Sequence, residues 1–169
     1  GAPAAILAYD RRQSLALSQF ASLEAQAAAI ADDIAYNAHD LDDGLRAGLF
    51  DLDAVRAAPF LAGLLDEVAL RRPGLERSRV IHELVRRVIT RFVEDAITES
   101  GRRIAASGVA SLEDVHRAGG TLIGLSPPLR AADRDIKRFL VANMDRHEQV
   151  KRVREKADLI VRRLFAAYV

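Results

Sequence analysis

The chain has 169 residues and a net charge of +1; half of its residues are apolar and 29% are charged. These values are typical of a globular protein with its own core, and they argue against a disordered or fibrous chain. No apolar stretch approaches the roughly 18 residues of a membrane span, and the absence of cysteine excludes disulfides and thiolate metal sites. We therefore expect a cytoplasmic protein that does not enter a membrane.

Residues 22–46 predict the first long helix. Apolar side chains recur at helical spacing from Leu23 to Leu45. Ser22 is a favourable residue for the helix start, and Gly44 and Gly48 mark the region where the helix should end.

The next segments continue the helical pattern. Residues 51–74 predict a short helix, a break near Pro59 and a second helix that ends at the Pro-Gly pair 73–74. A long helix should follow from Leu75 to about Ser107, because Gly108 is a typical helix terminator.

The remaining residues predict a short capped helix from Ser111, an apolar loop over residues 119–128 that packs against the core, and helices over 129–144 and 148–168. No stretch alternates polar and apolar residues as a strand would. The predicted fold class is all-α, an irregular helical bundle, with residues 1–169 forming a single all-helical domain.

The segment ADDIAYNAHDLDDGLR, residues 31–46, is unusually acidic. On a helical wheel of about 100° per residue, five of its polar side chains share one stripe nearly opposite the apolar face. We call this set the acidic stripe: Asp32, Tyr36, His39, Asp40 and Asp43. Residues 21–45 contain six acids and no Lys or Arg, although like charges at i,i+4 cost roughly 0.2–0.5 kcal/mol per pair. Carboxylates beside an imidazole can bind a divalent cation; the alternative is a solvated polar face.

The surrounding sequence resembles a known family. Residues 22–50, SLEAQAAAIADDIAYNAHDLDDGLRAGLF, resemble the segment with the last metal-binding aspartate of the HD-domain deoxynucleoside triphosphate triphosphohydrolases, the dGTPase-like family. The family pattern resembles E-x-Q, A-D-[DE]-I-[AS]-Y and H-D-x-[DE]-D, and this sequence matches it at residues 24–26, 31–36 and 39–43. The likeness continues through residues 77–97 and 135–169. It implies the C-terminal part of an HD-domain phosphohydrolase.

The resemblance also implies a reaction, in which a dNTP is cleaved to a deoxynucleoside and triphosphate. A divalent metal, such as Mg, Mn, Fe or Co, would be held by a His, a His-Asp pair and a distant Asp, and would lower the pKa of bound water. By the motif match, Asp32 resembles that distant Asp. Tyr36 and Asp40 resemble residues that line the sugar and phosphate pocket.

The sequence departs from the family in one respect. The first His and the His-Asp pair are absent, and the only methionine is Met144. We therefore expect the chain to be the later part of a longer enzyme, and the resemblance implies that this enzyme is a homo-oligomer. By itself it should neither hydrolyse dNTPs nor hold a metal tightly, because one carboxylate does not make a metal site.

Arg79 and His82 share a face near the start of the long helix and are candidates for phosphate or base contacts. The alternative is a solvated arginine face in which Glu83 pairs with Arg79 and Arg87. A different function also remains open, a non-catalytic helical module that mediates assembly or binds nucleic acid weakly, with the basic residues 151–156 neutralising phosphates. The Gly-Gly pair 119–120 lacks the following helix of a phosphate loop and predicts a turn.

Overall fold

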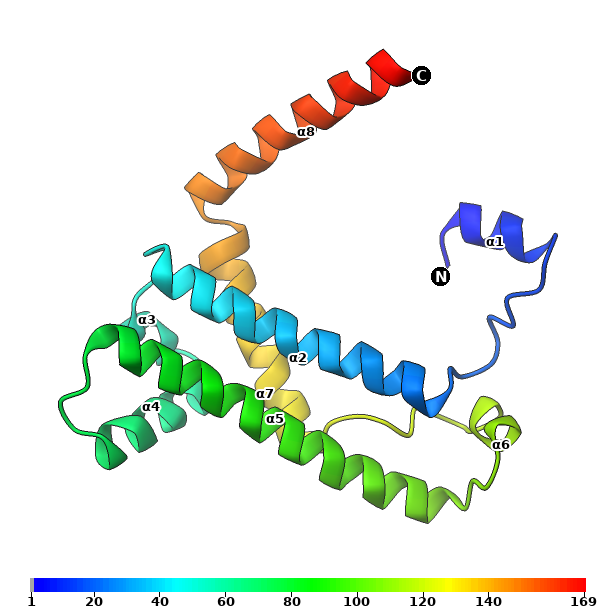
Figure 1. Cartoon of the computed structure of the whole chain (residues 1–169), viewed down its shortest axis with the longest axis horizontal. Helices are drawn as coiled ribbons and strands as arrows, with labels where there is room; N and C mark the ends of the chain where they lie inside the picture. The colour runs from blue at the N-terminus through cyan, green and yellow to red at the C-terminus, as the bar shows by residue number, and fades with distance from the viewer. Residues whose placement is uncertain (1) are drawn as a thin grey trace.

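The computed structural model describes residues 2–169. This part of the chain contains α-helices and one π-helical turn but no strand, which confirms the all-α fold class. The elements are α1 (Ala4–Asp10), α2 (Leu23–Arg46), α3 (Leu52–Val55), α4 (Pro59–Arg71), α5 (Arg77–Ser107), α6 (Leu112–His116), α7 (Pro127–Leu140), η1 (Val141–Asp145) and α8 (Glu148–Tyr168) (Figure 1).

The two longest helices, α2 and α5, lie side by side and run in opposite directions (Figure 1). At one end of the pair, Arg77 Nη2 donates to the carbonyl oxygen of Leu45 at 3.1 Å. Helix α4 packs on α5, and α7 crosses the pair and contacts both α2 and α4. The core lies where these four helices meet, and its most deeply buried large side chains are Leu41, Leu45, Val55, Leu61, Val68, Ile81, Leu84, Val88 and Ile136.

The helix ends follow the local sequence signals. Ser22 Oγ accepts a hydrogen bond from the Ala25 amide at 3.3 Å, and Ser111 and Asp114 form a reciprocal capping box at the start of α6. Gly108 ends α5 in the left-handed conformation with φ of 68°. These predictions are confirmed.

The predicted helix over residues 129–144 differs from the observed one at both ends. Helix α7 begins earlier, at Pro127, because proline suits the first turn of a helix. Its end widens into the π-helical turn η1, in which the Arg146 amide donates to the Val141 carbonyl at 3.2 Å. This turn sets the direction in which α8 leaves the core.

The loop over residues 119–126 is held against α2 by the side chain of Gln26. Its Oε1 accepts hydrogen bonds from the amides of Leu122 at 2.8 Å and Ile123 at 3.1 Å, and its Nε2 donates to the Ala21 carbonyl at 2.7 Å. Gln26 and Leu122 are both buried. The prediction that this loop packs down is confirmed.

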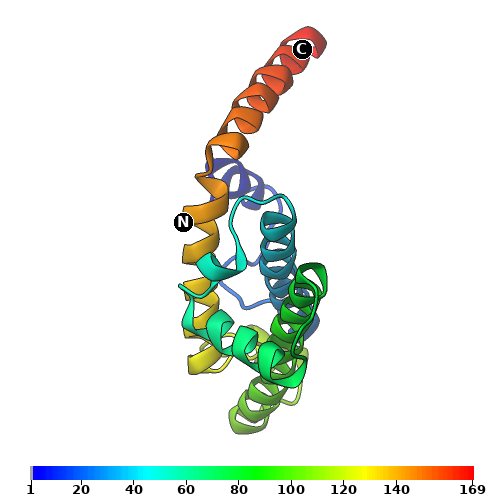
Figure 2. The ribbon, with the colours of Figure 1, turned by 90° about the vertical axis from the view of Figure 1, so that its left-hand side faces the viewer.

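Helices α1 and α8 lie away from the core, and α8 projects from the body of the molecule (Figures 1 and 2). Every residue from 151 to 169 is exposed. The single-domain organisation therefore stays a prediction. Within residues 2–169, no helix combines the length and the hydropathy needed to cross a bilayer.

Replacing Gly44 by alanine should destabilise the fold. An added Cβ would fall on the ring of Phe50, which stacks edge-on against Phe139 with ring centroids 4.9 Å apart. We expect a loss of about 1–3 kcal/mol from overpacking, measured by urea unfolding followed by circular dichroism. Gly63→Ala is the matched control, because nothing lies within 4 Å of a Cβ there, and it should stabilise α4 by about 0.5–1 kcal/mol. Equal effects of the two substitutions would contradict the packing argument.

Replacing Gln26 by alanine should also destabilise the fold, because the buried amide of Leu122 would lose its acceptor. The expected loss is about 1–3 kcal/mol, together with faster hydrogen exchange of the amides of residues 122 and 123. Gln149→Ala, at an exposed position of α8, should change neither quantity. Unchanged exchange in the Gln26 variant would show that other contacts hold the loop.

Candidate functional site

The acidic stripe occupies the outer face of α2. Asp32, Tyr36, His39 and Asp43 are exposed, whereas Asp40 is partly buried. Tyr36 keeps 63% of its surface accessible, which is unusual for an aromatic side chain in the middle of a long helix. The fully buried leucines of α2 lie on its other face, so the polar and apolar stripes are separate, as the wheel predicts.

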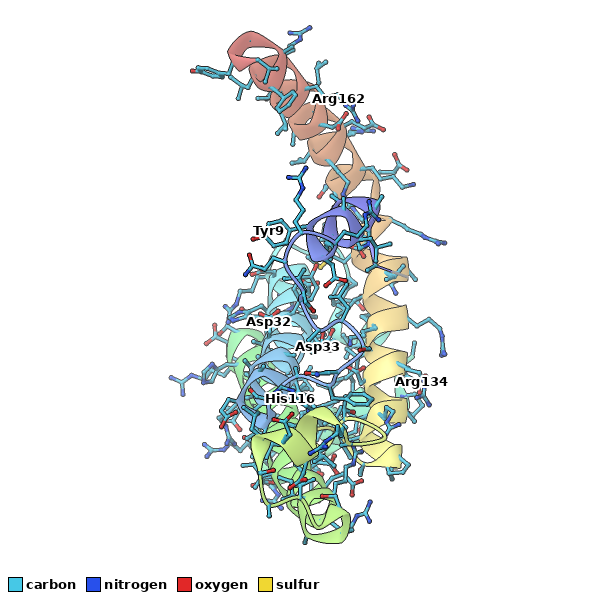
Figure 3. All side chains as sticks on the ribbon, turned by 90° about the vertical axis from the view of Figure 1, so that its right-hand side faces the viewer. Tyr9, Asp32, Asp33, His116, Arg134 and Arg162 are labelled. Atoms are coloured by element: carbon cyan, nitrogen blue, oxygen red, sulfur yellow. The ribbon has the colours of Figure 1, made fainter. Side chains whose placement is uncertain are left out.

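The five aspartates of residues 31–46 divide into two groups. Asp33 Oδ2 lies 3.7 Å from Lys137 Nζ of α7, and Asp42 Oδ2 lies 2.6 Å from Arg46 Nε. Figure 3 labels Asp32 and Asp33 on α2, with Arg134 marking α7. Within residues 2–169, the three aspartates of the acidic stripe form no ion pair with Lys or Arg. The aspartates without an ion pair are therefore those of the stripe, although Arg46 is near enough to Asp43 for their charges to attract each other.

Asp40 is the most perturbed carboxyl group of the stripe. Partial burial raises its pKa above the ordinary aspartate value, and repulsion from Asp145 and Asp43 raises the pKa further. A hydrogen bond from Tyr36 and the proximity of His39 oppose this shift. Asp145 belongs to η1, so carboxylates of two different elements face each other at this end of the stripe.

The described residues do not form a metal site by themselves. Among residues 2–169, no three His, Cys, Asp or Glu side chains are grouped closely enough to hold a metal ion. Asp32 offers one carboxylate, whereas protein sites for divalent metals combine several ligands. Any metal held by Asp32 would need further ligands from outside the described chain.

Arg79 and His82 lie in the first turns of α5 and are exposed. Within the described residues, neither side chain has a hydrogen bond or an ion pair to α2. Glu83 pairs with Arg87 at 3.6 Å, as predicted, but its other partner is Arg86 at 3.0 Å, so the expected pairing with Arg79 is wrong. Tyr36 and Asp40 therefore lie on one face of α2, whereas Arg79 and His82 lie on α5, and the assignment of all four to one site stays a prediction.

Two contributors to this region have no clear signal in the sequence. Asp145 reaches the neighbourhood of Asp40 only because α7 continues into η1. Asn37 is buried and donates to Asp133 Oδ1 of α7 at 2.8 Å, which fixes α2 against α7 beside the stripe. The sequence indicates the structural role of Asn37 only weakly, through a polar residue at a position that flanks the apolar stripe.

Comparisons with known proteins give the relationship of the chain. A family model described as a phosphohydrolase-associated domain matches residues 123–169, which include α7, η1 and α8. A deoxyguanosinetriphosphate triphosphohydrolase-like protein of Brucella ovis is 52% identical over 165 residues, which cover 98% of this chain and 41% of that protein. Proteins of the same name from Azorhizobium caulinodans and Allorhizobium ampelinum are 49% and 47% identical over 167 residues, which cover 99% of this chain and 42% and 41% of those proteins.

The chain thus spans about two fifths of the length of the curated relatives it matches. The class is therefore that of an all-helical chain whose residues 123–169 match a phosphohydrolase-associated domain. Within that class, the chain belongs to the deoxyguanosinetriphosphate triphosphohydrolase-like family, in its C-terminal portion, so the resemblance drawn from the sequence is confirmed.

Asp40→Asn should stabilise the fold at neutral pH. Because the folded-state pKa of Asp40 is raised, the ionised carboxylate is less favourable in the folded than in the unfolded chain, and stability should rise as pH falls through the folded pKa. The gain should be a few tenths of a kcal/mol, roughly the cost of a like-charge pair, and should vanish at low pH, as measured by thermal melts from pH 3 to 8.

Asp33→Asn is the matched control, because it removes a carboxylate that faces Lys137. It should be neutral or slightly destabilising at pH 7. A stabilising effect of the same size in both variants would contradict the assignment of repulsion to the stripe.

Proposed function

We propose that this chain is the part of a metal-dependent dNTP triphosphohydrolase that supplies one metal-binding carboxylate, Asp32, and part of the nucleotide pocket. The proposal rests on the difference between the aspartates of α2 that form ion pairs and those that do not. Asp33 and Asp42 have basic partners, whereas the carboxylates of the acidic stripe form no ion pair with Lys or Arg in the described part of the chain. A face that keeps like charges together without internal neutralisation is suited to a cation and polar ligand from outside the chain. The names of the relatives support the same substrate class.

Within this proposal the stripe residues have different roles. Asp32 contributes an oxygen ligand to the metal, together with ligands that lie outside this chain. Tyr36 lies one turn further along α2, and its exposed ring can stack on a deoxyribose, where a 2′-hydroxyl would be excluded sterically. Asp40 lies one turn beyond Tyr36 on the same stripe, and its carboxylate can accept a hydrogen bond from a sugar hydroxyl. The choice among Mg, Mn, Fe and Co and the homo-oligomeric state stay predictions from the resemblance. The roles of Arg79 and His82 in phosphate contact and the cytoplasmic location stay predictions from the sequence itself.

A second candidate function has one observation in its favour. Helix α8 is exposed along its length, and the apolar residues Val153, Ile160 and Leu164 recur on one side of it at the spacing of a helix–helix seam. A helical assembly module would use such a face. Weak nucleic-acid binding would instead use the basic residues 151–156. Neither function accounts for the lack of ion pairs at Asp32, Asp40 and Asp43 within residues 2–169, beside the paired Asp33 and Asp42.

In the longer protein that this proposal implies, Asp32→Ala should lower kcat/KM for dGTP hydrolysis at least about 10³-fold, because loss of a metal ligand removes several kcal/mol of transition-state stabilisation. The substitution is at an exposed position, so helicity should be unchanged. Asp33→Ala on the neighbouring residue is the control and should retain most of the activity. Full activity of Asp32→Ala would refute the ligand assignment.

The 169-residue chain by itself should release no triphosphate from dGTP and should not bind Mn²⁺ tightly, because a single carboxylate does not complete a metal site. Triphosphate release can be followed by ion-exchange chromatography, and Mn²⁺ binding by calorimetry. Metal-dependent release by this chain would show that its own residues form the catalytic centre.

A further inference from the structure

A cavity of about 710 Å³ lies at the C-terminal end of α5, away from the acidic stripe. Its walls are the last turns of α5, helix α6 and residues 117–122. The volume falls within the roughly 300–1,000 Å³ of small-molecule sites. We call it the arginine cavity, because three arginines line it: Arg102, Arg103 and Arg117.

The positive charges of the arginine cavity are only partly compensated. Arg102 and Arg103 share one carboxylate, since both Nε atoms donate to Glu99, at 2.8 and 2.9 Å. Arg117 donates to the backbone carbonyl of Glu113 at 3.2 Å and forms no ion pair within residues 2–169. The acid in the wall, Asp114, accepts from Ser111 and Ala110 in the capping box of α6. Three guanidinium groups therefore face two carboxylates that are already hydrogen-bonded.

Backbone donors line the same cavity. The amides of Gly119, Gly120 and Thr121 donate no hydrogen bond within the described chain, whereas Ala118 before them donates to Val115 and Leu122 after them donates to Gln26. Three consecutive unpaired N–H groups in a wall of the cavity are suited to an oxyanion. The two glycines have no side chain that would keep a ligand from the backbone.

The walls of the cavity are fixed by bonds to other parts of the fold. Arg103 Nη2 donates to the Leu125 carbonyl at 2.6 Å, and its guanidinium lies so close to Gly124 that a side chain there would displace it. Gln26 of α2 anchors Leu122 at the end of the unpaired segment. A preorganised site loses less conformational entropy when it binds a ligand.

We propose that the arginine cavity binds a phosphate-bearing small molecule through its phosphate oxygens, either an inorganic polyphosphate or a nucleotide. Guanidinium groups match phosphate oxygens in charge and geometry, and unpaired amides supply further donors. A small molecule fits better than a nucleic acid, because the three arginines gather around one open pocket and do not extend into a longer basic surface. The cavity is separate from the acidic stripe, whose carboxylates would repel a phosphate that lacks a metal.

The test is calorimetric titration of the 169-residue chain with inorganic triphosphate, dGTP and deoxyguanosine, in low-salt buffer with EDTA. Triphosphate and dGTP should bind with Kd below about 1 mM, and deoxyguanosine should not bind. Binding of dGTP but not triphosphate would identify a nucleotide as the ligand, and equal binding of both would identify the phosphate chain; either supports the proposal. In each case Arg117→Gln and Arg102→Gln should weaken binding about 10-fold or more, the usual effect of losing a charge-assisted hydrogen bond.

Arg138→Gln is the matched control, because Arg138 is an exposed arginine of α7 whose ion pair, to Asp135, lies far from the arginine cavity. Arg138→Gln and Asp32→Ala, each tested as a single substitution, should leave the binding of triphosphate and dGTP unchanged. Loss of binding in Asp32→Ala would locate the ligand at the acidic stripe, which would overturn this inference and leave the proposed function standing.

The inference would also be overturned by three other results. The first is that neither triphosphate nor dGTP binds saturably. The second is that Arg138→Gln weakens their binding as much as Arg117→Gln and Arg102→Gln do. The third is that a single-stranded oligonucleotide binds and the small molecules do not. In ¹H–¹⁵N NMR spectra, the amides of Gly119, Gly120 and Thr121 should shift most on titration. Larger shifts elsewhere would place the ligand outside the arginine cavity.

Discussion

The packing of α2 against α5 is the constraint on which the rest of the structure depends. Leu41 and Leu45 of α2 are completely buried, and Ile81 and Leu84 of α5 are as deeply buried beside them. A helix that buries one face must present the other, so the acids of α2 are directed outward by the same packing that forms the core. Helix α7 then covers one flank of α2 through Asn37 and Lys137. The remaining exposed strip is the acidic stripe.

That geometry separates acids that neighbour each other in sequence. Asp32 and Asp33 are adjacent, yet a rotation of about 100° between successive residues puts only Asp33 within reach of α7. Asp42 forms an ion pair with Arg46 one turn later along the same helix, whereas Asp43 forms none within residues 2–169. Charge on this helix is therefore neutralised on the flanks and retained on the stripe. A general need for solubility would not require this division, because it would be met equally well by mixed charges.

Local sequence signals are sufficient to predict where the helices lie. Contacts between residues far apart in the chain cannot be predicted from those signals. Ser22, Gly108 and the Ser111 capping box act on residues within four positions, so their effects are readable from a short window. Gln26 illustrates the opposite case. It was recognised as part of a family motif, but its bonds to residues 122 and 123 depend on how the whole bundle closes.

In the candidate sites, too, the sequence predicts the local arrangement and not the long-range contacts. The wheel predicts that Asp32, Tyr36 and Asp40 share a face because that follows from one helix alone. The approach of Asp145 to Asp40 depends on the π-helical turn, and no pattern in residues 141–145 announces that turn. The sequence correctly predicts a turn without a following phosphate-loop helix at the Gly-Gly pair 119–120. Its position beside Arg102 depends on the packing of α6 and the following loop against the end of α5, which the sequence does not indicate.

The molecule therefore carries two unbalanced charge environments of opposite sign that cannot neutralise each other. Arg77 pairs with the end of α2, so Asp40 is level with the first turns of α5, and Arg102 follows about 20 residues later, roughly 30 Å along the helix axis. This distance exceeds the Debye length of about 8 Å at physiological ionic strength, so the attraction between the two regions is screened. The two proposals are therefore compatible in one molecule, because a cation at α2 and a phosphate group at the end of α5 would bind regions of opposite charge that lie far apart along the same helix pair.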